Sequence, residues 1–239
     1  MSKNTSQPTA GKAGMLISDS SPFQVKEAFK TVRSNLLFTL ATTDSKAFTV
    51  SSPLPSEGKS TSCANLAIAF AQTGAQVLLI DCDLRKPMVH RLFRLSNDRG
   101  VTSVLCGANK IEEALHQDVK PNLDVMPAGP LSPNPSELLG SAQMSELLSI
   151  VQKAYDYVIL DTPPVNVVSD ALIVSQQTAG VVLILRQNQS RHDQLKKALE
   201  SCEMANVNVM GLVVNDVKAQ AGGYYKYKYK YNYDYSTKA

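Results

Sequence analysis

The sequence of 239 residues predicts an α/β fold in which a doubly wound, mostly parallel sheet is flanked by helices and followed by a flexible, tyrosine-rich C-terminal tail. Two observations predict the sheet: short apolar runs recur along the chain, and segments with helical periodicity lie between them. Runs that are apolar at every position are typical of strands covered on both faces, as in parallel sheets. Regular alternation of such strands with helices is the pattern of α/β proteins.

The first elements surround a short glycine-containing loop. Residues 1–22 are rich in Ser, Thr, Gly and Lys, and we expect them to form a flexible leader. A helix is predicted over residues 23–41, because apolar side chains recur there every three or four positions. A strand at 48–51 should then lead through the loop into a helix over 61–72, which Gly74 ends.

The later elements complete one domain. Continuous apolar runs predict further strands at residues 77–80, 157–160, 181–185 and 209–214. Helices are predicted over residues 141–154, 169–177 and 191–204. These elements place a folded domain at residues 23–220 and leave residues 221–239 as the tail.

Composition excludes several classes of protein. The net charge of +3 belongs to the tail, where four lysines face Asp234 alone, so the body carries no broad basic face and we expect no nucleic-acid binding. The four cysteines form no CxxC pair, which argues against a thiolate metal site. No apolar run approaches the ~18 residues of a membrane span, and the N-terminus lacks the apolar core of a signal peptide. We therefore expect a cytoplasmic location.

The loop before the second helix carries the sequence Gly58-Lys59-Ser60. A strand–loop–helix turn aims backbone N–H groups at one spot, and the helix N-terminus adds partial positive charge. Lys59 can reach a β- or γ-phosphate, Ser60 can ligate Mg²⁺, and Thr61 continues the first helical turn. The strict motif would place glycine where Pro53 stands, so a surface turn with a lysine is the alternative. The context favours a P-loop NTPase-like site for ATP and Mg²⁺.

Carboxylates follow two of the predicted strands. Asp81 and Asp83 come at the end of one strand, and Asp161 ends another. In open α/β sheets, ligands bind at the carboxyl edge of the strands. Mg²⁺ takes few protein carboxylates and keeps water and phosphate oxygens as its other ligands. We expect Asp161 to act on the metal side through water, and Asp81 or Asp83 to orient or deprotonate an attacking hydroxyl.

Basic residues lie beside these carboxylates. Arg85 and Lys86 follow Asp83, and Arg186 ends a later strand. Each could neutralise charge on a phosphate. A solvated loop position is the alternative for all three.

Five segments together resemble one known family, the bacterial tyrosine kinases (BY-kinases) of capsule and exopolysaccharide synthesis, in its cytoplasmic form that works with a separate membrane adaptor. They are Glu27–Asn35, Ser51–Thr61, Val77–Pro87, Val158–Pro164 and the tyrosine-rich tail. In the family they correspond to the oligomerisation helix, the phosphate loop, the second acidic motif, the Walker B motif and the autophosphorylation tail.

Two positions depart from the family pattern. Ser56 stands where the phosphate loop of the family has a glycine, so a positive φ at this position would strain the serine. The oligomerisation helix carries Glu27, Lys30 and Arg33 in place of Glu, Arg and Arg. Lysine keeps the charge but loses the bidentate fork of arginine, which weakens the expected ring assembly.

The resemblance implies ATP:protein-tyrosine phosphotransfer. It assigns catalysis to Lys59, Asp81 and Asp83, and metal binding to Ser60, Asp83 and Asp161. The nucleotide-binding residues that it implies are Ser56, Glu57, Gly58, Lys59, Ser60, Thr61, Arg85 and Asn215.

Seven of the nine tyrosines lie in the tail. They are Tyr224, Tyr225, Tyr227, Tyr229, Tyr231, Tyr233 and Tyr235. Their alternation would also suit an edge strand, and tyrosine interleaved with lysine could stack on nucleobases. Beside a kinase-like body we favour a substrate arm hinged at Gly222-Gly223 and phosphorylated in trans within an oligomer.

The resemblance also implies partners. These are a membrane-anchored polysaccharide co-polymerase adaptor that activates the chain and recruits it to the inner face of the membrane, a cognate tyrosine phosphatase, and sugar-nucleotide dehydrogenases or glycosyltransferases as substrates. The first alternative is a switch ATPase of the septum-positioning or plasmid-partition type, in which a second lysine would stand where this chain has Leu54. The second alternative is a catalytically inactive binding module.

Overall fold

The computed structural model describes residues 16–217, in which seven strands form one sheet. The strands are β1 (Ala47–Ser51), β2 (Val77–Asp81), β3 (His116–Lys120), β4 (Leu123–Met126), β5 (Tyr157–Asp161), β6 (Val181–Arg186) and β7 (Val209–Asn215). Their spatial order is β3-β4-β2-β5-β1-β6-β7. All neighbouring pairs are parallel except β3 with β4. The predicted mostly parallel α/β sheet is confirmed.

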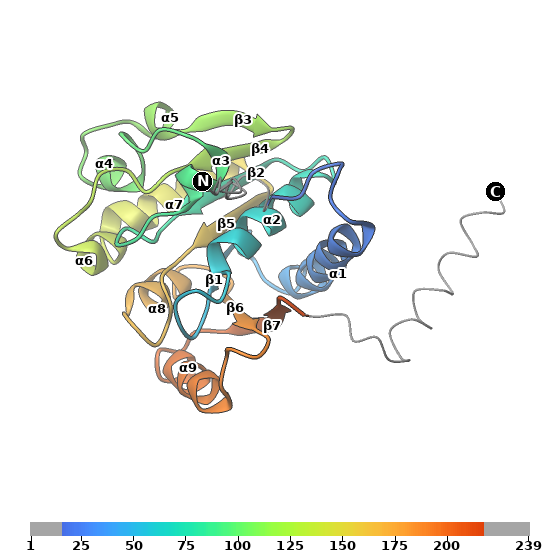
Figure 1. The fold of residues 1–239 in the computed structure, drawn as a ribbon. Helices are drawn as coiled ribbons and strands as arrows, with labels where there is room; N and C mark the ends of the chain where they lie inside the picture. Colours follow the sequence, from blue (N-terminus) through green and yellow to red (C-terminus); the bar gives the residue numbers. More distant parts are fainter. Residues whose placement is uncertain (1–15, 218–239) are drawn as a thin grey trace, which may run out of the picture.

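Helices cover both faces of this sheet (Figure 1). They are α1 (Phe23–Leu40), α2 (Lys59–Ala71), α3 (Val89–Phe93), α4 (Val101–Leu105), α5 (Ile111–Ala114), α6 (Pro135–Leu139), α7 (Ala142–Ala154), α8 (Asp170–Ser175) and α9 (His192–Met204). Within the described range, no helix is both long and apolar enough to cross a bilayer.

Alternate side chains of the central strands divide the core between the two faces. Leu79 of β2 and Ile159 of β5 pack in the cluster that includes α1 and α2. Their neighbours Leu78 and Val158 pack on the other face, in the cluster that includes α4 and α7. Because both faces are covered, the strands are apolar at nearly every position, which is the pattern that predicted them.

Two features differ from the sequence prediction. The strands β3 and β4 and the short helices α3 to α6 were not predicted, because His116–Lys120 is polar and half-exposed and the other elements are only four or five residues long. The predicted leader overlaps the packed domain, since Ile17 is buried and its N–H donates to Asn65 Oδ1 at 2.8 Å. The rest of the leader, residues 1–15, and the tail from residue 218 lie outside the described residues.

Candidate active site

The loop between β1 and α2 contains two residues in the left-handed region of φ. Gly58 has φ of +91° and Ser56 has φ of +69°. A left-handed conformation costs an L-residue roughly 1–2 kcal/mol, and glycine avoids that cost. The strain expected at Ser56 is therefore present. Lys59 and Ser60 begin α2 and Thr61 lies in its first turn, so the loop leads directly into a helix N-terminus, the arrangement that is typical of phosphate sites.

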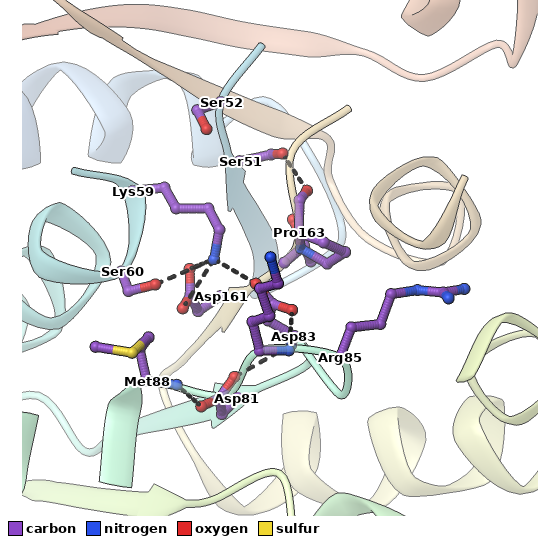
Figure 2. A network of polar contacts seen from close by, with 12 residues as sticks. Ser51, Ser52, Lys59, Ser60, Asp81, Asp83, Arg85, Met88, Asp161 and Pro163 are labelled. Carbon is purple, nitrogen blue, oxygen red and sulfur yellow. Dashed lines mark hydrogen bonds and ion pairs between the residues drawn. The ribbon is translucent and has the colours of Figure 1, made fainter. Parts of the chain in front are cut away.

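The predicted carboxylates meet at the carboxyl edge of the sheet. Asp81 and Asp161 are register partners on β2 and β5, and Asp83 follows two residues beyond β2. All three are buried. Lys59 extends from α2 into this group, as Figure 2 shows.

The ammonium of Lys59 is held by oxygens from three of the predicted site residues. Its Nζ lies 2.9 Å from Asp83 Oδ2, 3.3 Å from Asp161 Oδ1 and 3.0 Å from Ser60 Oγ. These three residues are the ones that the sequence predicted as metal ligands. A cation therefore already occupies the oxygen cluster, which shows that its donors suit a positively charged group.

Burial and like charges shape the protonation of the cluster. Burial disfavours the charged form of Lys59, but Asp161 and Asp83 outweigh it and raise the pKa of the ammonium above its ordinary value. Burial and the neighbouring Asp161 raise the pKa of Asp81 to about 8. Burial also raises the pKa of Asp161 against the opposing effect of Lys59. One ammonium thus faces three buried carboxyl groups, and a further cation at this site would offset their repulsion.

Asp81 and Asp83 have different surroundings. Asp81 Oδ1 accepts from the N–H of Asp83 at 3.1 Å, and its Oδ2 accepts from the N–H groups of Met88 and Val89 at 3.0 and 2.9 Å. These bonds fold residues 82–88 back over the end of β2. Asp83 Oδ2 instead faces Lys59. Asp81 organises the loop, whereas Asp83 presents an oxygen to the site.

Two of the predicted nucleotide-binding residues support the phosphate loop. The buried carboxylate of Glu57 accepts from the N–H of Leu54 at 2.8 Å and from the hydroxyl of Ser190. Asn215 donates from Nδ2 to the carbonyl of Glu57 at 3.2 Å. The same amide nitrogen would be 2.2 Å from a Cβ added at Gly58, so a larger residue there would have to displace the Asn215 amide. The direct nucleotide contacts predicted for Glu57 and Asn215 stay predictions.

Arg85 binds a partner outside the cluster. Its Nε lies 2.8 Å from Asp170 Oδ2, and its Nη2 lies 3.1 Å from Asp170 Oδ1 and 3.0 Å from Ser136 Oγ. Figure 2 shows the side chain pointing away from Lys59. Asp170 is completely buried at the start of α8. In this arrangement the guanidinium of Arg85 is engaged by Asp170 and Ser136, and the nucleotide contact predicted for it stays a prediction.

The predicted oligomerisation residues lie on α1. Glu27 and Lys30 form an exposed ion pair of 2.7 Å within this helix. Arg33 donates from Nη1 to the carbonyl of Ala69 at 2.7 Å, near the C-terminal end of α2. Their role between chains stays a prediction, and the seven tail tyrosines lie outside the described residues.

Sequence reasoning missed the partners that hold the site. Asp170 lies 85 positions beyond Arg85, and Ser190 lies 133 positions beyond Glu57. Neither belongs to a motif, and no local pattern could have paired them. Arg186 carried a weak signal as a charged residue at a strand end, and it contacts the phosphate loop.

Several known proteins with a similar sequence are bacterial tyrosine-protein kinases. The chain matches the family described as AAA domain over residues 56–206. It is 42% identical over 202 residues to the tyrosine-protein kinase YwqD of Bacillus subtilis, a match that covers 83% of this chain and 85% of YwqD. It is 33% identical over 198 residues to the tyrosine-protein kinase Wzc of Salmonella typhimurium, but there it covers only 28% of the longer protein and 83% of this chain.

Solved structures agree with these relatives. The chimerical protein CapA2B2 superposes with a TM-score of 0.80 at 35% identity, covering 86% of this chain and 91% of that one. The septum site-determining protein MinD of Pyrococcus horikoshii, complexed with Mg-ADP, has a TM-score of 0.60 at 20% identity, covering 71% and 69%, and shares the fold alone. From its site geometry, its fold and these relatives, the chain belongs to the bacterial tyrosine-protein kinases, a family built on the P-loop NTPase fold.

Proposed function

We propose that this chain transfers the γ-phosphoryl group of ATP to tyrosine hydroxyls in the C-terminal tail of a second copy, and so regulates capsule or exopolysaccharide synthesis. The observation that carries the proposal is the buried ammonium of Lys59 among Asp83, Asp161 and Ser60, beside a left-handed loop and a helix N-terminus. The membership of the chain in the tyrosine kinase family supports the choice of tyrosine as acceptor.

The residues around Lys59 also fit a magnesium ion. Ser60, Asp83 and Asp161 would hold it, directly or through water, as hard oxygen donors. When bound, Mg²⁺ neutralises charge on the phosphates of ATP. Lys59 would then turn from the carboxylates to the β- and γ-phosphates, because its stem belongs to the first turn of α2.

Proton acceptance falls to the carboxyl pair after β2. When the tyrosine oxygen forms its bond to phosphorus, the bond to the ADP oxygen breaks and the phenol proton passes to Asp81 or Asp83. Asp81, with its pKa raised to about 8 by burial and Asp161, suits proton transfer near neutral pH. Asp83 presents the oxygen that contacts Lys59. Separate Asp81→Asn and Asp83→Asn variants distinguish the two assignments through their pH–rate profiles.

The acceptor tyrosines are expected in the tail. Of the two tyrosines in the described range, Tyr155 donates to Asp124 Oδ2 at 2.6 Å, and Tyr157 packs edge-on against Phe70 with ring centroids 4.9 Å apart. Both side chains are half-buried. The other seven tyrosines, from Tyr224 to Tyr235, would be the substrates.

Assembly would use α1. The exposed pair of Glu27 and Lys30 can exchange its internal contact for one across an interface, with Arg33 beside it. Phosphorylation adds about −1.5 to −2 charges per tyrosine. A heavily phosphorylated tail would repel its neighbours and loosen a ring-like homo-oligomer.

The proposal includes the partners that the family resemblance implies. A membrane-anchored polysaccharide co-polymerase adaptor would recruit this cytoplasmic chain and activate it. A tyrosine phosphatase would reverse the modification, and sugar-nucleotide dehydrogenases or glycosyltransferases would be further substrates.

A mixing experiment tests transfer in trans. A full-length Lys59→Met chain is incubated with an active chain that lacks residues 221–239, together with ATP, Mg²⁺ and the cytoplasmic segment of the adaptor. Phosphotyrosine on the Lys59→Met chain supports transfer between copies. If the wild-type chain labels itself but the mixture stays unlabelled, transfer within one chain replaces the proposal. Phosphate release without phosphotyrosine in the wild type would favour a switch ATPase.

A further inference from the structure

The phosphate loop is held by side chains from two segments that lie more than 120 residues later in the sequence. Three side chains donate to consecutive carbonyls of the loop: Gln189 to Pro55 at 3.5 Å, Arg186 to Ser56 at 3.2 Å, and Asn215 to Glu57 at 3.2 Å. Arg186 ends β6, Gln189 lies in the connection after it, and Asn215 ends β7. The loop is thus fastened at the stretch where its backbone turns left-handed.

The bond to Ser56 falls where the loop is strained. Ser56 adopts φ of +69°, a region that costs a non-glycine residue roughly 1–2 kcal/mol. The other left-handed residue of the loop is a glycine, Gly58, which avoids that cost. A serine at this position therefore needs contacts elsewhere to keep the loop in its phosphate-binding conformation.

The guanidinium that makes this bond is itself fixed. Arg186 donates from Nε and Nη2 to Asp216 Oδ2 at 3.0 and 2.9 Å, which leaves Nη1 for the carbonyl of Ser56. Its backbone N–H donates to Ser190 Oγ at 2.7 Å. The side chains of Arg186 and Asp216 are 40% and 53% exposed, so their ion pair adds little to global stability. The ion pair instead orients the guanidinium of Arg186 toward the carbonyl of Ser56.

We propose that Arg186 is a positioning residue for the phosphate loop. Its guanidinium holds the left-handed Ser56 in place, and Asp216 orients that guanidinium. This inference rests on the proposed binding of MgATP and deepens it. Arg186 touches neither phosphate nor acceptor in this role. It lowers the cost of keeping the loop N–H groups convergent before the nucleotide arrives, so it should act on nucleotide affinity and leave the chemical step alone.

The test measures the dissociation constant of MgATP by titration calorimetry on full-length chains. Arg186→Gln should weaken binding about ten-fold, the effect of losing roughly one hydrogen bond that orders the loop. Asp216→Asn should weaken MgATP binding about three-fold, since the guanidinium of Arg186 loses the carboxylate that orients it but keeps its charge. The matched control is Arg191→Gln, which removes an exposed arginine paired with Asp193 and should leave binding unchanged.

Rescue separates positioning from a merely structural role. Adding Ser56→Gly to Arg186→Gln should restore binding to within about two-fold of wild type, because glycine holds a positive φ without help. In kinase assays, Arg186→Gln should raise the KM for ATP and leave kcat at saturating ATP unchanged. Circular dichroism checks that each variant is folded. If Arg186→Gln does not fold, Arg186→Lys is measured in its place.

Each result has a distinct meaning. If wild type binds MgATP and Arg186→Gln binds equally well, the inference is wrong. If binding is weakened but Ser56→Gly restores nothing, Arg186 acts by another route and the inference is again wrong. If the wild type does not bind MgATP at all, the proposed function itself fails.

Discussion

Lys59 is both the cation that neutralises the buried carboxylates and the group expected to contact the phosphates. Its ammonium lies among Asp83, Asp161 and Ser60 with only 11% of its side chain exposed. Like charges this deeply buried are strongly destabilising without a partner. The stability of the fold therefore depends on the charge balance between Lys59 and the buried carboxylates around it.

Replacing Lys59 should change the stability of the fold in a pH-dependent way. Lys59→Met should lower the free energy of unfolding by about 3 kcal/mol, since it leaves buried carboxylates unpaired. The loss should be larger at pH 8 than at pH 5, because the pKa of Asp81 is raised to about 8 by burial and by Asp161, and protonated carboxyl groups need no counter-charge. Urea unfolding at both pH values measures it. Lys153→Met, an exposed change on α7, is the control, and an equal loss at both pH values would contradict the explanation.

Ser56 provides a second residue-scale prediction. Ser56→Gly removes left-handed strain but adds freedom to the unfolded chain, so we expect a net gain of about 0.5–1 kcal/mol in the free energy of unfolding. Ser145→Gly in the interior of α7 should instead lose about 1 kcal/mol. Thermal and urea unfolding of the two variants gives the comparison. Destabilisation by Ser56→Gly would show that the serine carries no strain.

At the scale of elements, the loop after β2 is held at both ends. Asp81 accepts three backbone N–H groups within it, and Arg85 joins it to the buried Asp170 of α8 and to Ser136 of α6. The loop that carries Asp83 is thereby joined to α6 and α8 through the polar contacts of Arg85.

This view of Arg85 can be tested against the phosphate-binding prediction. Arg85→Ala should lower the free energy of unfolding by about 2 kcal/mol, because Asp170 is left buried with one hydroxyl partner. The dissociation constant for MgATP should stay within about two-fold of wild type. Arg91→Ala, an exposed change on α3, is the control. A ten-fold weaker affinity without loss of stability would restore Arg85 as a nucleotide-binding residue.

At the scale of the whole molecule, the tyrosines are divided between the body and the tail. Tyr155 and Tyr157 are the two in the described range, and each is packed or hydrogen-bonded. Burial and the contact with Asp124 raise the pKa of the Tyr155 hydroxyl, so it stays protonated at physiological pH. The Tyr155 hydroxyl is therefore engaged with Asp124, and the Tyr157 ring is packed against Phe70.

Removing the tail should separate binding from phosphorylation. A chain ending at residue 217 should bind MgATP as wild type does and should carry no phosphotyrosine after incubation with ATP, Mg²⁺ and the adaptor segment. Mass spectrometry and calorimetry provide the two readouts. Phosphate on Tyr155 or Tyr157 in the shortened chain would overturn the assignment of acceptors.

The sequence determined the fold class and most of the carboxylate cluster at the edge of the sheet. Four of the predicted strands are continuous apolar runs, and Asp81, Asp83 and Asp161 lie at or just beyond the ends of two of them, so their meeting at one edge is a consequence of parallel strands. The loop with Lys59 is recognisable as a local motif, although the left-handed Ser56 within it is contacted by the distant Arg186. The polar β3 and the four-residue β4 lacked such a signal.

Tertiary structure alone decided which distant groups hold these parts in place. The strand order puts β5 beside both β2 and β1, and thereby makes Asp81 and Asp161 direct neighbours. It also brings Arg186 to Ser56 and Asp170 to Arg85. The periodicity of apolar residues in a sequence indicates only which positions are buried, because burial follows from the helix or strand to which a position belongs. The choice of a polar partner depends on where the chain returns, and no single segment contains that information.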